Sequence, residues 1–254
     1  MGQAILEWRA LKKYFSTPRG LLHAVDDVSF SIDAGKTLGV VGESGCGKST
    51  LGRTILRLLP ATSGQVLFEG RNILNCDKKE SLELRKKMQI VFQDPYASLD
   101  PRKTVFQTIS EPLRYHHMYH SEQEVSQRTY ELMRTVGLTE RYAMTYPHEM
   151  DGGRRQRIGI ARALALNPKF VVCDEPVSAL DVSIQAQVLN LMMDLQDQMG
   201  LTYLFITHNL SVVKHISDEI AVMYLGQMIE RAASRELFQH PAHPYTKALL
   251  AAIP

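Results

Sequence analysis

Apolar residues follow two spacings along most of this chain: short continuous runs, and recurrence at every third or fourth position. Continuous runs occur at 37–41, 170–173 and 202–207, and each has the length of a buried strand. Helical spacing dominates between them, for example in the stretch that ends at Gly200. Because strands that alternate with helices assemble into parallel sheets, the pattern predicts an α/β fold with a mainly parallel sheet. A ligand is then expected at the carboxyl ends of the strands.

The amino-terminal part shows a different pattern. Strand-like stretches at 5–15 and 22–32 are separated by a turn-rich break, Ser16–Gly20, and predict an antiparallel β part. Tyr14 lies in the first of these stretches. An aromatic ring at this place is either a platform for a nucleotide base or a half-buried strand residue, and both interpretations remain open.

The stretch from 94 to 167 contains no convincing strand. It opens with a proline-punctuated loop at 94–102. A capping box at Ser121–Glu124 then starts one helix, and Asp151 stands at the start of another. We therefore predict a helical subdomain inserted in an α/β core. The predicted parts are a core formed by 1–93 and 168–235, the inserted subdomain 94–167, and a carboxy-terminal tail 236–254 that is either native or truncated.

The strand at 37–41 is followed by a glycine-rich turn and a helix whose apolar positions extend to Leu58 and Leu59. The turn reads Gly42-Glu43-Ser44-Gly45-Cys46-Gly47-Lys48-Ser49-Thr50, which fits the phosphate-binding pattern G-x-x-x-x-G-K-S. Glycines allow successive backbone N–H groups to turn toward phosphates, and the helix N-terminus adds positive potential. Lys48 is expected to reach the β- and γ-phosphates, and the Ser49 hydroxyl to bind Mg²⁺. The other residues expected at the nucleotide are Gly42, Ser44, Gly45, Cys46, Gly47 and Thr50.

Composition limits the class of protein. The chain has 254 residues, 44% of them hydrophobic and 22% charged, as in soluble globular proteins. A net charge of +2 gives no general drive toward nucleic acid, so no nucleic-acid partner is expected. Three widely separated cysteines suit a reducing compartment. Without an apolar leader or an apolar run of about 18 residues, the chain is expected to be cytosolic and to reach a membrane only through a partner.

Two strand ends carry side chains suited to phosphoryl transfer. The apolar run at 170–173 ends in Asp174 and Glu175, where one carboxylate can hold Mg²⁺ through water and the other can polarise an attacking water. The alternative interpretation, a purely structural turn at the strand end, explains poorly why two acidic residues end so apolar a strand. His208 follows the next strand and can bond a γ-phosphate, although a lone histidine is more often structural.

The order of these motifs resembles that of ATP-binding cassette (ABC) ATPases, whose core is a RecA-like P-loop NTPase fold, and the resemblance covers nearly the whole chain. The matching stretches are Gly42–Thr50 (P-loop), Gln93 (Q-loop), Gly152-Gly153 (signature), Val171–Glu175 (Mg²⁺-binding strand and catalytic glutamate), Ser178–Asp181 (D-loop) and His208 (switch histidine). Two further stretches, Phe92–Arg102 and His243–Leu250, resemble the dipeptide, oligopeptide and nickel importer branch.

The resemblance implies the ATP-hydrolysing motor subunit of a membrane importer for oligopeptides, dipeptides or nickel, with ATP and Mg²⁺ as cofactors. Tyr14 would stack on adenine, and the signature of one subunit, Asp151-Gly152-Gly153, would face the ATP on another subunit's P-loop. The implied catalytic residues are Lys48, Gln93, Glu175 and His208, and the implied metal-site residues are Ser49, Gln93 and Asp174. The implied partners are transmembrane permeases, a second ATPase subunit and, indirectly, an extracytoplasmic substrate-binding protein. The implied location is the cytoplasmic face of the cell membrane, where the permeases would hold the chain peripherally.

The signature departs from the family pattern at one position. The usual Leu-Ser-Gly-Gly-Gln is replaced here by Met-Asp-Gly-Gly-Arg, so that Asp151 stands where a serine would donate to the partner's γ-phosphate. Like charges about 4 Å apart repel by about 4 kcal/mol at an effective dielectric of about 20. Either this charge weakens one ATP site, or it is offset by Arg154, Arg155 and Mg²⁺ while Asp151 serves as a helix N-cap. The first alternative predicts a second, non-identical ATPase subunit.

An ABC-type ATPase that acts outside transport is the alternative function. Nucleic-acid-associated members resemble this chain in their motifs but carry a long coiled coil, whereas only about 75 residues separate Gln93 from Pro168. A regulatory module that binds ATP without hydrolysis would not need Glu175 and His208, which are both present.

Overall fold

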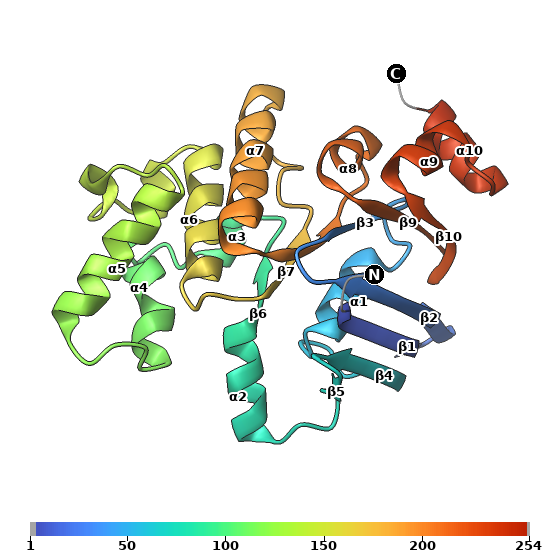
Figure 1. The fold of residues 1–254 in the computed structure, drawn as a ribbon, viewed down its shortest axis with the longest axis horizontal. Coiled ribbons are helices and arrows are strands. Elements are labelled where there is room, and N and C mark those ends of the chain that lie inside the picture. Colours follow the sequence, from blue (N-terminus) through green and yellow to red (C-terminus); the bar gives the residue numbers. More distant parts are fainter. Residues whose placement is uncertain (1–3, 253–254) are drawn as a thin grey trace. The chain divides into compact units, whose positions relative to one another are not determined.

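The computed structural model describes residues 4–252 and divides into two compact units. The first unit combines the residues up to Leu84 with those from Met199 onward, and the second contains Arg85–Gln198. The chain leaves the first unit inside helix α2 (Lys78–Lys87) and returns to it at the end of helix α7 (Val182–Met199) (Figure 1). The second unit is therefore a continuous segment inserted between two parts of the first.

An antiparallel sheet forms the amino-terminal part of the first unit (Figure 1). Strands β1 (Ala4–Thr17) and β2 (Gly20–Asp33) make a long hairpin, and β4 (Ser63–Phe68) and β5 (Arg71–Asn72) continue the sheet in the order β2-β1-β4-β5. Large apolar side chains on one face are fully buried, and Trp8 stacks on Phe30 with ring centroids 5.7 Å apart. The predicted antiparallel part is confirmed.

The second sheet of the first unit contains β3 (Thr37–Val41), β8 (Thr202–Ile206), β9 (Glu219–Tyr224) and β10 (Gln227–Ala233), in the order β10-β9-β3-β8. Strand β3 runs parallel to both β8 and β9, and all five of its residues are buried. Helix α8 (Leu210–Ile216) packs on β3 so closely that a Cβ at Gly39 would lie 2.9 Å from a methyl of Val213. The parallel sheet that the apolar runs predicted is confirmed.

One helical prediction in the first unit needs correction. Helix α1 (Lys48–Ile55) ends before Leu58 and Leu59, because Arg57 takes a left-handed conformation (φ 59°) that a helix cannot continue. Leu58 is consequently half exposed rather than part of the core. The tail contains the helices α9 (Ser234–Gln239) and α10 (Pro244–Ala251).

The second unit contains a parallel strand pair and a group of helices (Figure 1). Strands β6 (Met88–Val91) and β7 (Phe170–Asp174) pair in parallel, with Val91 opposite Cys173. The helices are α3 (Pro95–Ser98), α4 (Val105–Tyr115), α5 (Glu122–Thr135), α6 (Gly152–Leu164) and α7, with short 3₁₀ turns at Glu140–Tyr142 and Pro147–Glu149.

Side-chain caps explain where these helices start. The predicted capping box at Ser121 is present at the start of α5, and the Thr104 side chain closes a second box at the start of α4. The 94–102 stretch was predicted as loop throughout, which is wrong for Pro95–Ser98. The carboxylate of Asp94 accepts hydrogen bonds from the amides of Tyr96 and Ala97 and so caps α3.

The helical insertion predicted at 94–167 lies inside the second unit. That unit also contains β6, β7 and nearly all of α7, which the prediction had assigned to the core. None of the helices within residues 4–252 is long and apolar enough to cross a membrane.

Candidate functional site

The P-loop follows β3 and leads into α1. Gly42 (φ 152°) and Gly47 (φ 109°) have backbone conformations that favour glycine. A Cβ at Gly42 would lie 2.1 Å from the carbonyl oxygen of Met223, and one at Gly47 would lie 1.9 Å from that of Ala24. The loop thus packs against the backbone of two other strands, which is why these two positions require glycine.

Lys48 begins helix α1 and is 4% exposed. Its Nζ donates hydrogen bonds to the carbonyl oxygens of Gly42, at 2.8 Å, and Glu43, at 2.7 Å. Carbonyl oxygens satisfy an ammonium group without neutralising its charge, so the positive charge remains available for phosphates. The Cys46 thiol is 3.7 Å from the same nitrogen, and burial raises the pKa of this thiol. The loop geometry therefore agrees with phosphate binding.

The first turn of α1 offers backbone amides and hydroxyls at its open end. Gly47 stands at the N-cap and provides no side-chain cap, and the positive end of the helix dipole at this point favours an incoming anion. Ser49 and Thr50 lie in this turn and are partly buried. Ser49 and Thr50, both predicted to bind the nucleotide, thus lie at the amino-terminal end of α1.

Tyr14 lies on β1 directly opposite His23 of β2. The two rings stack with centroids 3.9 Å apart and planes 10° from parallel. The Tyr14 hydroxyl donates to the carboxylate of Asp26, and this hydrogen bond raises the pKa of Tyr14 to about 12. One ring face is covered by His23, so a base can stack only on the other. The adenine platform remains a prediction.

His208 is exposed and follows Thr207 at the end of β8. The Thr207 amide donates to the carbonyl oxygen of Val40 on β3, at 3.1 Å. Because β3 and β8 are adjacent and parallel, His208 and the P-loop leave the sheet at the same edge. The structure therefore brings together these two predicted elements within the first unit.

Gln93 and Glu175 meet in the second unit. They follow the neighbouring parallel strands β6 and β7, and the Gln93 Nε2 donates to the Glu175 Oε2 at 3.1 Å. Glu175 has a left-handed backbone (φ 49°), which costs energy for a non-glycine residue and occurs most often at functional sites. Its carbonyl oxygen accepts hydrogen bonds from the amide and hydroxyl of Ser178, which hold this conformation.

Asp174 is the last residue of β7 and is 1% exposed. A carboxylate at a strand end offers the oxygen ligands that a hard divalent cation prefers. No cluster of three or more His, Cys, Asp or Glu side chains with the geometry of a metal site occurs within 4–252.

The signature forms the start of α6. The Asp151 carboxylate accepts a hydrogen bond from the Arg154 amide at 2.7 Å and pairs with the Arg154 guanidinium at 2.8 Å. That guanidinium also lies 4.9 Å from the ring centre of Tyr142. Gly153 approaches α7, where a Cβ would lie 2.6 Å from a methyl of Ile184. Asp151 is thus both a helix N-cap and an ion-pair partner.

The predicted residues fall into two groups, one in each unit. The first unit contains Tyr14, the P-loop from Gly42 to Thr50, and His208. The second contains Gln93, Asp174, Glu175 and the signature residues Asp151, Gly152 and Gly153.

Sequence reasoning missed two residues that contact the P-loop. The Gly226 amide donates to the carbonyl oxygen of Cys46 at 2.9 Å, and the Glu43 amide donates to the Tyr245 hydroxyl at 3.1 Å. Both residues lie about 200 positions from the loop, so no local spacing connects them to it. The His-Pro-Tyr segment around Tyr245 was the available signal, but it was interpreted only as a mark of the importer branch.

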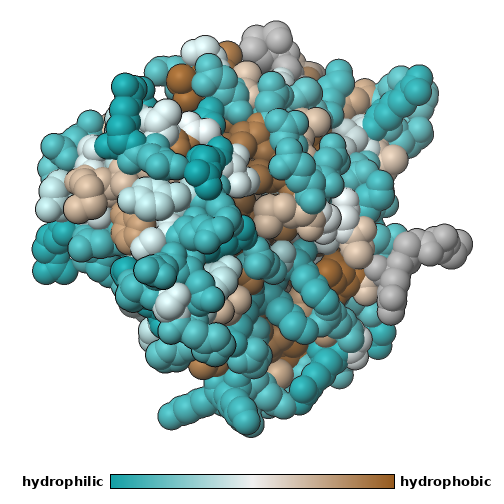
Figure 2. Space-filling view, turned by 60° about the vertical axis from the view of Figure 1, so that its left-hand side comes forward, coloured by the Kyte–Doolittle hydropathy of each residue, from teal (hydrophilic) through white to brown (hydrophobic). Residues whose placement is uncertain are grey.

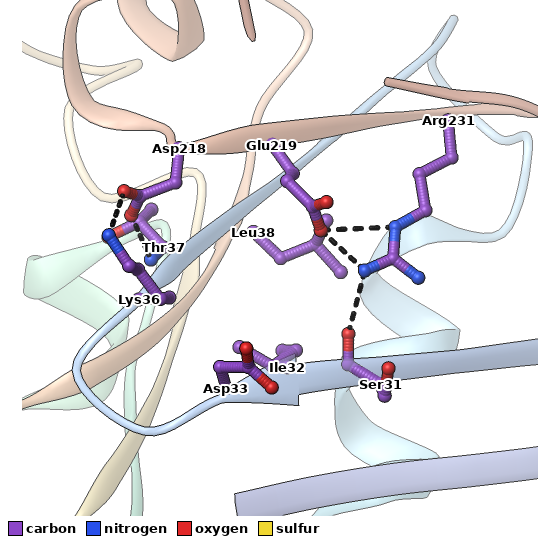
Figure 3. Close-up of a pocket in the computed structure, with 9 residues that line it drawn as sticks. All are labelled: Ser31, Ile32, Asp33, Lys36, Thr37, Leu38, Asp218, Glu219 and Arg231. Atoms are coloured by element: carbon purple, nitrogen blue, oxygen red, sulfur yellow. Dashed lines mark hydrogen bonds and ion pairs between the residues drawn. The ribbon is translucent and has the colours of Figure 1, made fainter. Parts of the chain in front are cut away.

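The first unit contains a cavity of about 270 Å³ (Figure 3). It is lined by the start of β3, whereas the P-loop follows the end of that strand. Four of its charged side chains form ion pairs: Lys36 pairs with Asp218 at 2.8 Å, and Arg231 pairs with Glu219 (Figure 3). The first pair joins the β2–β3 connection to the residue before β9, and the second joins β9 to β10. The P-loop follows the opposite end of β3.

Comparisons with known proteins agree with this geometry. Residues 25–178 match the family model described as ABC transporter. The chain is 58% identical, over its whole length and 84% of the relative's, to the oligopeptide transport ATP-binding protein OppF of Bacillus subtilis. It is 53% identical, over 96% of its length and 76% of the relative's, to the dipeptide transport ATP-binding protein DppF of Haemophilus influenzae.

A solved structure has the same fold. A dimeric, post-hydrolysis state of the ATP-binding cassette MJ0796 bound to ADP and Pi has a TM-score of 0.82 and 28% identity, over 91% of this chain and 99% of the other. The relatives named here are transport proteins, so they do not favour an ABC-type ATPase that acts outside transport. With its P-loop, its paired Gln93 and Glu175 and its α6 signature in place, this chain belongs to the ABC transporter family.

Proposed function

We propose that this protein is the ATP-hydrolysing subunit of an importer for oligopeptides or dipeptides. The observation that carries the proposal is the similarity over the whole chain to transport subunits named for those substrates. It is supported by a P-loop with a buried Lys48 and by Glu175, whose carboxylate accepts a hydrogen bond from Gln93. The hydrolysed bond is the γ-phosphoanhydride of ATP, with water as the acceptor.

The side chains of each unit have separate tasks in this reaction. In the first unit, Lys48 and the amides of the loop bind the phosphates, and His208 bonds the γ-phosphate. In the second, the Glu175 carboxylate orients the attacking water.

Mg²⁺, when bound, supplies neutralising charge to the phosphates. The oxygen donors suited to this hard cation are the Ser49 hydroxyl in the first unit and Asp174 and the Gln93 side-chain carbonyl in the second. Gln93 donates through Nε2 to Glu175, which leaves its Oε1 for a cation.

Uptake measured in cells tests the substrate class. Deletion of this chain is expected to abolish uptake of labelled di- to pentapeptides, and re-expression of the wild-type chain should restore it. Nickel uptake, measured in the same strains, should be unchanged. Loss of nickel uptake with normal peptide uptake would reassign the substrate, while normal uptake of both would overturn the importer role.

We further propose that transmembrane permeases dock on residues 94–167 and hold the chain at the cytoplasmic face of the cell membrane, where a substrate-binding protein delivers peptide from the other side. Hydrophilic residues dominate the face shown in Figure 2, and apolar residues interrupt it in small patches. Three large side chains of this segment are strongly exposed, namely Tyr96 (61%), Tyr115 (66%) and Met144 (74%). Exposed large apolar and aromatic side chains are typical of protein interfaces.

Photo-crosslinking tests the docking surface. A photoreactive residue at Tyr96 or Met144 is expected to crosslink to the permeases in membranes. The same residue at Asn190, which is exposed on α7, serves as the control. Crosslinks that form from Asn190 but from neither of the other two positions would contradict the assignment.

The charge of Asp151 is the reason to propose a second, non-identical ATPase subunit. This carboxylate would face the γ-phosphate bound at a partner's P-loop, and the repulsion between the two negative charges would weaken ATP binding at the site that this signature completes. In a homodimer both ATP sites would contain this repulsion, whereas in a heterodimer only one would. Arg154 offsets part of the charge, because the pair is bonded at 2.8 Å.

Asp151→Ser is expected to raise turnover at that site by about two- to fivefold, the equivalent of the ~0.5–1 kcal/mol typical of exposed charge pairs. Serine keeps the helix cap, so stability should change little. Arg154→Gln, which uncovers the carboxylate, should lower turnover instead. Phosphate release is measured for the subunit alone and with its partner. If Asp151→Ser leaves activity unchanged or lowers it, Asp151 is only a cap and ion-pair member.

A further inference from the structure

We propose that Tyr245 of the carboxy-terminal helix α10 is a positioning residue of the P-loop, and that it sets nucleotide affinity by fixing the Gly42–Glu43 peptide. This inference rests on the nucleotide-binding role proposed above. Tyr245 and the Gly42–Glu43 peptide both lie in the first unit. The Glu43 amide donates to the Tyr245 hydroxyl at 3.1 Å, and this hydroxyl is thereby brought to the loop from the other end of the sequence.

The bonded peptide also contacts the functional lysine. The Gly42 carbonyl and the Glu43 N–H belong to one planar trans peptide, so they point in opposite directions. On one side, the Lys48 Nζ donates to the Gly42 carbonyl at 2.8 Å. On the other side, the Glu43 N–H donates to Tyr245. Tyr245 therefore holds the orientation of a carbonyl that binds Lys48 directly.

Glycine makes this restraint necessary. Gly42 has no Cβ and a φ of 152°, so the peptide after it can rotate at little steric cost. Loss of the Tyr245 hydroxyl would leave this rotation limited mainly by Lys48 itself. The carbonyl that positions the Lys48 ammonium would then be less well fixed. A loop that must be ordered on binding has a lower affinity than one that is ordered beforehand.

Tyr245 is itself held in place at the start of α10. The Glu230 carboxylate accepts hydrogen bonds from the amides of Ala242, at 2.7 Å, and His243, at 2.9 Å. The His243 Nδ1 then accepts from the Tyr245 amide and caps the helix. The Tyr224 ring packs on that of Tyr245, with centroids 4.4 Å apart. Strands β9 and β10 thus fix the tyrosine, and the tyrosine fixes the loop.

The test is Tyr245→Phe, which removes one hydroxyl and keeps the ring. It is expected to raise the Kd for a fluorescent ATP analogue and for ADP by about two- to tenfold, the value of one hydrogen bond. The KM for ATP should rise by a similar factor while kcat changes little. Tyr224→Phe removes the hydroxyl of the neighbouring ring, for which the structure shows no hydrogen bond to the loop, and should leave Kd unchanged.

A double variant separates positioning from general stability. Because Tyr245 is proposed to act through the peptide that Lys48 contacts, Tyr245→Phe should have a smaller effect on ADP affinity in a Lys48→Ala background. Thermal unfolding shows whether each variant is folded. Equal Kd values for Tyr245→Phe and wild type would overturn the inference and leave the nucleotide-binding role intact. Equal effects in both backgrounds would also overturn it, whereas failure of the wild-type chain to bind nucleotide would instead remove the proposed function.

Discussion

Replacement of Glu175 by glutamine is expected to lower the steady-state rate of ATP hydrolysis by at least about a hundredfold, while ATP still binds. The amide has nearly the same shape as the carboxylate but cannot take a proton from water. Gln93 can still donate to the side-chain oxygen at this position, as it does now at 3.1 Å, so the local geometry should persist. Only the chemical step is removed.

Two measurements check this expectation. Phosphate release reports turnover, and a fluorescent ATP analogue reports binding. Because ATP then remains bound without being cleaved, the variant is also expected to accumulate as a closed dimer during gel filtration with ATP. Asp197→Asn, which removes an exposed carboxylate from α7 in the same unit, is the matched control and should hydrolyse ATP at the wild-type rate. Undiminished turnover in Glu175→Gln would take this residue out of the role of general base.

The parts of the fold that could be predicted are those that local sequence determines. The runs at 37–41 and 202–207 became β3 and β8, because strands buried on both faces are mostly apolar along their length. The placement of the candidate site residues followed from this, since the loop that leads to Lys48 follows β3 and His208 follows the end of β8. The capping box at Ser121 is local in the same sense, with donor and acceptor three residues apart.

The wrong predictions for α1 and α3 have local structural causes that residue propensities do not reveal. Apolar spacing alone suggested that α1 continued to Leu59, but the left-handed Arg57 ends the helical part after Ile55. The α3 turn was missed because Pro95 was read as a loop signal. It is instead the first helical residue behind the Asp94 cap, a position where proline's missing N–H costs nothing.

The contacts around the P-loop were beyond sequence reasoning for a different reason. The Gly226 amide and the Tyr245 hydroxyl reach the loop from segments about 200 residues away, and such proximity depends on the register of β9 and β10 in the sheet. The signature is an intermediate case. Its N-cap could be predicted from Asp151, whereas the contact of Arg154 with Tyr142 could not.

Lys48→Ala is expected to act on binding rather than on the chemical step. A charge-assisted hydrogen bond contributes about 1.5–3 kcal/mol, so the Kd for ATP and ADP should rise by about ten- to a hundredfold. Folding should tolerate the change. At 4% exposure the ammonium is desolvated, and its partners are the carbonyl oxygens of Gly42 and Glu43, with no carboxylate among them. Thermal unfolding is therefore expected to show little loss of stability.

Two matched variants complete this test. Lys48→Arg keeps the charge but places a wider, planar group between the same two carbonyls, so it should restore binding only in part. Lys247→Ala removes a positive charge from an exposed position on α10 and should leave Kd unchanged. Isothermal titration with ADP measures all three variants. If Lys48→Ala binds ADP as tightly as wild type, the ammonium does not contact the phosphates, and the amides of the loop must bind them alone. If it binds weakly while Glu175→Gln binds normally, the two residues divide binding and hydrolysis between them.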